Sequence, residues 1–395
     1  MSYTWDDIPS ALNSLNFEAN FRAALEGWKD NLEDMETRIP DGDYRELVYS
    51  KTVYKRNTVP TGGASTDAAS RRSFVLPSWM LIGINEVFYS VGASQTLDLN
   101  TSANWNSSET TYATAANRAG KDVYVYACEP SSGTTPDIVF SCDSSYPDDY
   151  TAASSRKIGG FHCLCAAVGT IAGHELTGYL QGDILPNSVW DLLYRAQSEN
   201  EGMVWSEKAG IWVDIYLASG TGASTASVNG GTISDNRNWM DVVDDFAAVK
   251  KRMLDDDEFT TIAAGSNEET NITGSADPVT TGGHSDTASQ RMISDIGCED
   301  CCGAVYQWLR TQTYQGNLDG GGAFDEAYTW KDQTDGQGEL ATQGDYGDAK
   351  LLAGGYWNAG VKCGSRSRNM NSYRWVTYGF AGARGCAEPR VVNLD

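Results

Sequence analysis

Cysteine and histidine are the residue types in this chain that could support the widest range of chemistry. The cysteines gather at Cys163/Cys165 and at Cys298/Cys301/Cys302. These spacings differ from the paired Cys-x-x-Cys arrangement of a structural zinc site. The chain also has only three histidines, at 162, 174 and 284. We therefore predict no metal centre and expect the cysteines to be buried or disulfide-paired.

The carboxylates suggest no catalytic site either. The sequence has no G-x-S-x-G motif, and the scattered histidines form no recognisable triad. Acidic pairs such as Asp244-Asp245 are more typical of a solvated helix face than of a general acid. Asp41–Arg45 and Asp332–Asp335 cluster oxygen ligands, but neither fits the EF-hand loop. We expect no cofactor and leave structural calcium open at these two places.

A segment near the C-terminus has the chemistry of recognition. The chain carries a formal charge of −24, yet no acidic residue lies between Asp348 and Glu388. The same stretch contains Lys350, Lys362, Arg366, Arg368, Arg374 and Arg384. Its other residues are largely Gly, Ser, Asn, Tyr and Trp, which is the composition of a paratope. We predict a binding surface here rather than an active site.

The overall composition excludes several classes of protein. The chain has 395 residues, of which 41% are hydrophobic and 41 are glycine, as expected for a globular, loop-rich protein of two or three domains. Its strong negative charge argues against non-specific nucleic-acid binding. No apolar run is long enough to span a membrane, and the segment Met1–Asp7 shows no secretory signal.

The elements that must position this surface begin with an amphipathic helix over residues 16–35. Its apolar residues recur at helical spacing: Phe17, Phe21, Leu25, Trp28, Leu32 and Met35. Such a helix can pack on its own domain or form a short oligomerisation seam, and both alternatives stay open. We assign residues 1–44 to this helical segment.

Residues 45–148 are predicted to form an all-β domain. Short β-rich runs alternate with turns rich in Gly, Ser, Asn and Thr. The runs are 46–54, 73–76, 86–91, 95–99, 121–127 and 138–140. This spacing predicts a β-sandwich, with an immunoglobulin-like architecture left open. Residues 147–156 are interpreted as a linker.

Residues 157–395 have a mixed α and β pattern. Trp205 and the run 211–217 predict paired strands across the turn Lys208–Gly210. Val242, Phe246, Val249 and Met253 predict an amphipathic helix with an acidic outer face. The domain is therefore expected to be α+β.

Several landmarks follow one another in this part of the chain. They are Gly160–Cys165, Gly178–Leu192, Trp239-Met240, Lys251–Leu254, Ser294–Asp300, Val305–Leu309, Gly354-Gly355-x-Trp357, Gly364–Arg366 and Gly382–Gly385. In this order they resemble the variable proteins of diversity-generating retroelements, which have a C-type lectin fold. That superfamily also includes the formylglycine-generating sulfatase-modifying enzymes. The resemblance covers residues 157–395.

The resemblance implies a division between scaffold and display. In such proteins, adenine-mutagenising reverse transcription randomises codons for solvent-facing residues near the C-terminus. Here the variable region would span about 354–386. The implied scaffold residues are Trp308, Trp357, Gly364, Arg366, Ala383, Arg384 and Gly385. The implied ligand-contacting residues are Tyr356, Asn358, Val361, Ser367, Asn369, Asn371, Ser372, Tyr373, Val376, Tyr378, Gly379 and Phe380.

The function implied is that of a non-enzymatic ligand- or receptor-binding protein with a hypervariable surface. It would be the receptor-binding tip of a virus or a cell-surface display protein, located on the virion surface or the cell exterior. Its partner would be a protein or glycan receptor on a host or neighbouring cell, and a homo-oligomer is left open. One alternative is a copper oxidase of the formylglycine-generating type, although the spacing of Cys363 and Cys386 does not match a trusted motif. Another is a structural component of a virion tail.

Overall fold

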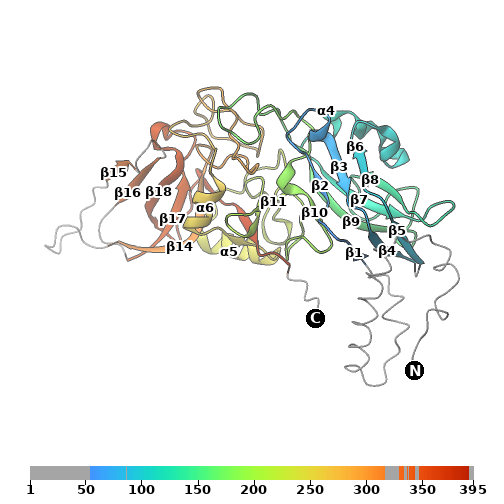
Figure 1. The fold of residues 1–395 in the computed structure, drawn as a ribbon. Helices are drawn as coiled ribbons and strands as arrows, with labels where there is room; N and C mark the ends of the chain where they lie inside the picture. The colour runs from blue at the N-terminus through green and yellow to red at the C-terminus, as the bar shows by residue number, and fades with distance from the viewer. Residues whose placement is uncertain are drawn as a thin grey trace, which may run out of the picture.

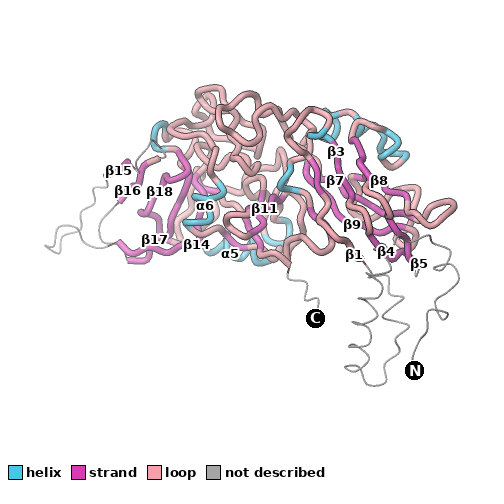
Figure 2. Tube along the Cα trace, in the orientation of Figure 1, coloured by secondary structure: helices cyan, strands magenta, loops and turns pink. Residues whose placement is uncertain are grey.

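The structure is a computed structural model that describes residues 54–85, 87–315, 329–332, 336, 338–342 and 347–390. The predicted helix over 16–35, the whole 1–44 segment and Asp41–Arg45 lie outside the described residues, as do residues 333–335 of the second acidic cluster. Strands gather at the two ends of the molecule, and loops fill most of its middle (Figures 1 and 2). The described part is therefore mainly strand and loop, with few helices.

The N-terminal part is built from short strands separated by turns. They are β1 (Tyr54–Lys55), β2 (Thr61–Gly62), β3 (Ser73–Leu76), β4 (Met80–Ile84), β5 (Val87–Val91), β6 (Gln95–Asp98), β7 (Asp122–Cys128), β8 (Asp137–Ser141), β9 (Ser155–His162) and β10 (Trp190–Asp191). The sheet orders are β1-β4-β5, β2-β3-β6 and β10-β9-β7-β8. A shared core contains Phe74, Phe140 and Phe161, with the rings of Phe74 and Phe161 stacked at 5.4 Å. The runs predicted at 73–76, 86–91, 95–99, 121–127 and 138–140 coincide with strands of this part.

The predicted linker at 147–156 does not separate two packed units. β9 begins within it, at Ser155, and pairs antiparallel with β7 along most of its length. Ile184 and Val189 also join the core of the N-terminal strands. Buried strand-forming residues follow the polar stretch at once, so its turn composition marked a loop between paired strands rather than a domain boundary.

Turns and short helices connect these strands. The 3₁₀ turns are η2 (Ser70–Arg72), η3 (Ser102–Asn104), η4 (Ser107–Ala113), η5 (Pro186–Ser188), η6 (Gly222–Ser224) and η7 (Gly360–Lys362). The α-helices are α4 (Ala115–Arg118), α5 (Trp239–Ala248) and α6 (Asp256–Ile262). No helix of the described residues combines the length and the apolar character that crossing a membrane requires.

Capping residues determine where α5 and α6 begin. In α5 the Asn238 side chain accepts hydrogen bonds from the amides of residues 240 and 241, and Asp241 completes a capping box. Asp255 and Glu258 form the same arrangement in α6. Val242 and Phe246, four residues apart, are buried on one side of α5. The predicted helix is thus confirmed through Val242 and Phe246, whereas Met253 lies in the next strand.

The middle of the molecule contains a sheet that joins distant parts of the chain. Its strands are β11 (Met203–Ser206), β12 (Ile211–Asp214), β13 (Arg252–Met253) and β20 (Gly385–Ala387), in the order β11-β12-β20-β13. The predicted pairing across Lys208–Gly210 is confirmed, because Trp205 lies opposite Trp212. β20 enters between β12 and β13, so the C-terminal end of the variable segment is fixed within this sheet.

The sheet at the C-terminal end carries the segment predicted to bind. Its strands are β14 (Tyr306–Gln315), β15 (Thr329–Asp332), β16 (Glu339–Thr342), β17 (Gly347–Gly354), β18 (Gly364–Tyr373) and β19 (Ala381–Gly382). The order is β15-β16-β18-β17-β14-β19. β17 and β18 are antiparallel neighbours with two register shifts. Figure 1 shows this sheet at the opposite end of the molecule from β4 and β5.

Candidate recognition surface

The first loop of the predicted variable region leaves β17 through a tight glycine turn. Gly354 and Gly355 have φ values of 88° and 82°, which favour glycine. A Cβ atom on Gly354 would lie 2.3 Å from the carbonyl oxygen of Cys301. Beyond this turn, the amide of Trp357 donates to the carbonyl of Ala304 at 2.8 Å. Backbone contacts therefore position the start of the loop.

A fixed asparagine holds the same loop from the opposite side. Asn271 donates to the carbonyl of Trp357 at 2.6 Å and accepts from the amide of Gly360 at 3.1 Å. Neither bond uses a side chain of the loop. The side chains of the loop can thus change while its path is retained, which is what a display scaffold requires.

The second loop, between β18 and β19, is held in the same way. The carbonyls of Arg374 and Tyr378 accept from the amides of Trp239 and Asn236, both at 3.0 Å. The amide of Tyr306 donates to the carbonyl of Phe380 at 2.9 Å. Main-chain bonds to residues outside the segment therefore position this loop as well.

The two loops bring three predicted contact residues together. Tyr356, Tyr378 and Phe380, here called the aromatic face, are half-buried and pack over the core that contains Tyr306 and Trp308. The ring of Phe380 lies 5.1 Å from that of Tyr356 and 4.7 Å from that of Tyr378. Such half-exposed rings offer a large contact area with little conformational freedom to lose.

The other predicted contact residues differ in exposure. Asn358 and Val361 are exposed, with Val361 at 58%. Five more are half-buried: Asn369, Asn371, Tyr373, Val376 and Gly379. Ser367 and Ser372, by contrast, are buried at 0% and 1% exposure.

The burial of Ser367 and Ser372 corrects their expected solvent exposure. Ser367 donates through its hydroxyl to the carbonyl of Lys362. Both serines lie on β18, where the irregular pairing with β17 breaks the simple alternation of inward and outward side chains. A large ligand cannot reach either residue in this conformation.

Sequence reasoning also left one exposed aromatic residue out of the contact set. Trp375 is 62% exposed, and its ring stacks on that of Tyr373 at 5.0 Å with an interplanar angle of 4°. Its exposure adds Trp375 to the candidate surface.

The expected scaffold residues are mostly enclosed. Trp308 is 1% exposed and donates through its indole to the carbonyl of Arg237 at 3.2 Å. Gly364, Ala383, Arg384 and Gly385 are buried, and Trp357 is half-buried. Arg366 is exposed, so its side chain does not belong to the packed interior.

Arg384 links the two C-terminal sheets from inside. Its guanidinium donates to the carbonyls of Asp214 at 2.8 Å and Ile215 at 2.5 Å, to the carbonyl of Glu299, and to the Gln307 side chain at 3.1 Å. Its neighbour Gly385 donates to Asp214 Oδ2 at 3.1 Å, and a Cβ there would lie 2.5 Å from that oxygen. The Gly-Ala-Arg-Gly landmark is therefore a packing and hydrogen-bonding requirement.

Other basic residues of the segment also serve the interior. Lys350 is 3% exposed, donates to Gln312 Oε1 at 2.9 Å and lies 4.3 Å from the centre of the Trp239 ring. Arg368 is 6% exposed and pairs with Asp256 on α6. The exposed or half-buried cations are Lys362, Arg366 and Arg374. Half of the positive charges in this segment are therefore buried rather than presented to a ligand.

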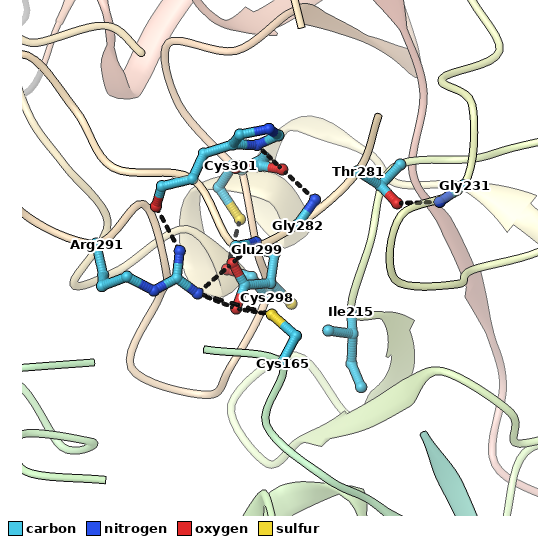
Figure 3. Close-up of polar contacts among 12 residues, drawn as sticks. Cys165, Ile215, Gly231, Thr281, Gly282, Arg291, Cys298, Glu299 and Cys301 are labelled. Carbon is cyan, nitrogen blue, oxygen red and sulfur yellow. Dashed lines mark hydrogen bonds and ion pairs between the residues drawn. The ribbon is translucent and has the colours of Figure 1, made fainter. Parts of the chain in front are cut away.

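A buried polar cluster lies near Arg384. Arg291 donates to both carboxylate oxygens of Glu299 at 2.6 and 2.8 Å, and the Cys165 thiol donates to Glu299 at 3.4 Å (Figure 3). Burial raises the pKa of Glu299 above its ordinary value, and the charge of Arg291 opposes that rise. The carbonyl of Glu299 also accepts from Arg384. The cluster connects this loop to the C-terminal sheets.

The cysteines have the character of core residues. Among the described residues, which include all nine cysteines, none forms a disulfide and no His, Cys, Asp and Glu group could hold a metal ion. Burial raises the pKa of the Cys363 thiol to about 12 and also raises the pKa of Cys386. These two thiols donate to different places, Cys363 to Tyr356 and Cys386 to Met253. Because of these raised pKa values, both thiols are protonated at neutral pH.

Glu268 provides a pH-sensitive contact at the start of β18. Its carboxylate accepts from the amide of Ser365 at 3.1 and 3.2 Å. Burial raises its pKa to about 7 from 4.5, although the Ser365 hydrogen bonds oppose this. The folded protein therefore binds more protons than the unfolded chain between these pH values, and its stability falls as the pH rises through them.

We expect Glu268→Gln to flatten this dependence. At pH 8 the variant should melt a few degrees above the wild type, because it lacks the buried charge but keeps the acceptor for Ser365. At pH 4.5 the two Tm values should nearly coincide. Thermal unfolding from pH 4.5 to 8 checks this, and parallel curves for the two proteins would rule out Glu268 as the titrating group.

The chain is similar to known phage proteins in both sequence and fold. Residues 82–191 match the family described as the Mtd second domain. The tail fiber receptor-binding protein of Bordetella phage BPP-1 is 27% identical over 301 residues, which cover 70% of this chain and 73% of that protein. The solved U1 variant of the major tropism determinant superposes with a TM-score of 0.63 at 23% identity, covering 90% of this chain and 89% of that one.

The chain is similar to the major tropism determinant over most of its length. The P3c variant of the major tropism determinant gives the same result, with a TM-score of 0.64, 22% identity and the same coverage. The resemblance predicted from the C-terminal landmarks is thus confirmed, and it extends into the N-terminal strands. The match to the Mtd second domain runs from β4 to β10 and includes the predicted linker.

Proposed function

We propose that this chain is the receptor-binding tip of a virus and displays a hypervariable surface on a C-type lectin scaffold. The observation that carries the proposal is that, within residues 354–386, the contacts that fix the backbone are separate from the side chains that can meet a ligand. Main-chain bonds and buried residues such as Arg384 fix the backbone, while Tyr356, Asn358, Val361, Tyr378 and others face outward. The similarity to a tail fiber receptor-binding protein supports a place on the virion surface.

We infer that the partner is a receptor on the host cell, and we favour a protein epitope. The aromatic face is broad and half-exposed, and shallow aromatic surfaces of this kind suit protein contacts better than a small molecule. Structural contact with other virion proteins is the competing role. An enzyme of the copper-oxidase type is not favoured, because the Cys363 and Cys386 thiols are enclosed, have raised pKa values and donate to different elements.

For the domains, we propose a sandwich-like unit from residue 54 to about 191 and a lectin unit after it. The basis is that β9 and β10 pair in the N-terminal sheet and that Ile184 and Val189 pack in its core. This moves the boundary from the predicted start at residue 157. The helical segment over residues 1–44 remains a prediction.

The receptor role predicts that the purified chain binds saturably to host cells and blocks adsorption of the virus that carries it. Adsorption assays with increasing concentrations of chain provide the measurement. Full adsorption of the virus at a saturating concentration of the purified chain would contradict a receptor-binding role and favour the structural role.

Diversification of the surface predicts a near-copy of the codons for residues 354–386 close to a reverse transcriptase gene in the surrounding DNA. Mismatches should be confined to adenines of the copy and should fall on outward-facing residues such as Asn358. Sequencing of the flanking DNA checks this. Absence of both the copy and the reverse transcriptase would leave a binding surface that is not diversified in this way.

A further inference from the structure

A cleft with a volume of about 440 Å³ lies away from the aromatic face. Its walls come from segments far apart in sequence: the loop after β2, residues 175–187, the β11–β12 turn, the end of α6, and Asp295-Ile296. None of the described residues that line it belongs to the 354–386 segment. The volume lies within the range of about 300–1,000 Å³ that is usual for small-ligand sites.

Contacts within the protein hold the walls of the cleft in place. The Trp205 ring packs against those of Tyr194 at 5.7 Å and Trp212 at 5.8 Å, and its indole N–H donates to Glu207 at 2.7 Å. β11, which carries Trp205, lies in the middle of the molecule between the two ends rich in strands (Figure 1). These contacts reduce the ordering that a ligand would have to impose.

The far wall is held by hydrogen bonds of the Asp295 side chain and main chain. Asp295 accepts from the amide of Glu175 at 3.3 Å, and its own amide donates to the carbonyl of Ala264 at 2.8 Å. Its side chain remains 31% exposed. Asn187 lies next to this wall, with its amide group 3.4 Å from the carbonyl of Ile296. A half-buried carboxylate and a half-buried amide thus lie on one side of the cleft.

The lining combines apolar residues such as Leu176 and Ile296 with hydrogen-bond acceptors and donors. Glu175, Glu207 and Asp295 supply acceptors, whereas Asn187 and Lys208 supply donors. The three carboxylates outnumber Lys208 and therefore oppose an anionic ligand. Hydroxyl groups both donate and accept, so a ligand rich in hydroxyls can pair with the carboxylates and with the donors of this lining. A sugar ring also has an apolar C–H face, and the indole of Trp205 offers such a face a partner.

We propose that this cleft binds a neutral hexose unit of a glycan. It is a second site, separate from the aromatic face, and its existence does not depend on the receptor role of that face. The ligand would bind weakly as a single sugar, since a single ring makes few contacts. Repeated copies on a particle would strengthen attachment through avidity.

The test uses the full chain and four neutral probes: the methyl glycosides of glucose, galactose and mannose, and N-acetylglucosamine. Saturation-transfer NMR and tryptophan fluorescence should show saturable binding of at least one of them at millimolar concentration. The 6-phosphate of the sugar that binds most tightly should bind at least about tenfold more weakly than that sugar itself, because the cleft carries three carboxylates.

Matched variants locate the binding. Asn187→Ala should weaken the Kd by about tenfold, whereas Asn358→Ala, on the loop between β17 and β18, should leave it unchanged. Trp205→Ala should abolish binding, and Asn187→Ala provides the test if loss of the indole disturbs the fold. Absence of saturation for all four probes would overturn the proposal, as would equal binding by the two asparagine variants or equal binding of the sugar and its 6-phosphate. Cell binding through the aromatic face can persist in every one of these cases.

Discussion

Replacing Arg384 with alanine is expected to destabilise the fold by about 3–5 kcal/mol or to prevent folding. The guanidinium is 1% exposed and donates to backbone carbonyls from β12, the residue after it and the Glu299 loop. Its removal leaves these buried acceptors and the Gln307 side chain without a donor, and each such loss costs about 1–3 kcal/mol. It also leaves Asp214 with less positive charge nearby, although Lys251 still pairs with it at 2.6 Å.

Arg366→Ala is the matched control. Arg366 belongs to the same segment but is exposed, so its loss should change stability by about 0.5 kcal/mol or less. Chemical denaturation of both variants gives the comparison, and Arg384→Met retains most of the packing volume if the alanine variant does not fold. Equal, small losses for Arg384→Ala and Arg366→Ala would contradict a structural role for the buried guanidinium.

Local patterns in the sequence predicted many of the elements. Alternating β-branched and aromatic residues identified the strands around Phe74, Val125 and Phe140, and the turn at Lys208–Gly210 identified the β11–β12 hairpin. The spacing of four between Val242 and Phe246 identified α5. These signals are local, so they can be recognised in the sequence without knowledge of the tertiary fold.

Features that depend on long-range pairing could not be predicted in this way. The pairing of β9 with β7 crosses a stretch that has the composition of a linker, and only the partner strand shows that the chain continues in the same sheet. The cleft around Trp205 is assembled from loops that are distant in sequence, and no sequence motif identifies it.

The candidate surface was predicted in outline and corrected in detail. Composition and resemblance placed recognition in residues 354–386, and the structure brings Tyr356, Tyr378 and Phe380 together. Ser367 and Ser372 were misjudged, because the register shifts between β17 and β18 determine which side chains point inward. The basic residues were misjudged for another reason. Arg368 is buried and pairs with an acidic residue, Asp256, that lies 112 positions away in the sequence.

The measurement that tests the central claim most directly compares host-cell binding by two double variants. Val361→Ala/Tyr378→Ala alters the candidate surface, whereas Val87→Ala/Tyr146→Ala removes the same residue types from exposed positions of the N-terminal unit, where Val87 is 47% and Tyr146 is 41% exposed. If the surface is the receptor site, the first variant should lose at least about 2 kcal/mol of binding free energy, or roughly thirtyfold in Kd. The second should bind like the wild type, and the Tm values of both should confirm that they are folded. Unchanged binding by the first variant, or an equal loss by the second, would contradict the assignment of the receptor site to residues 354–386.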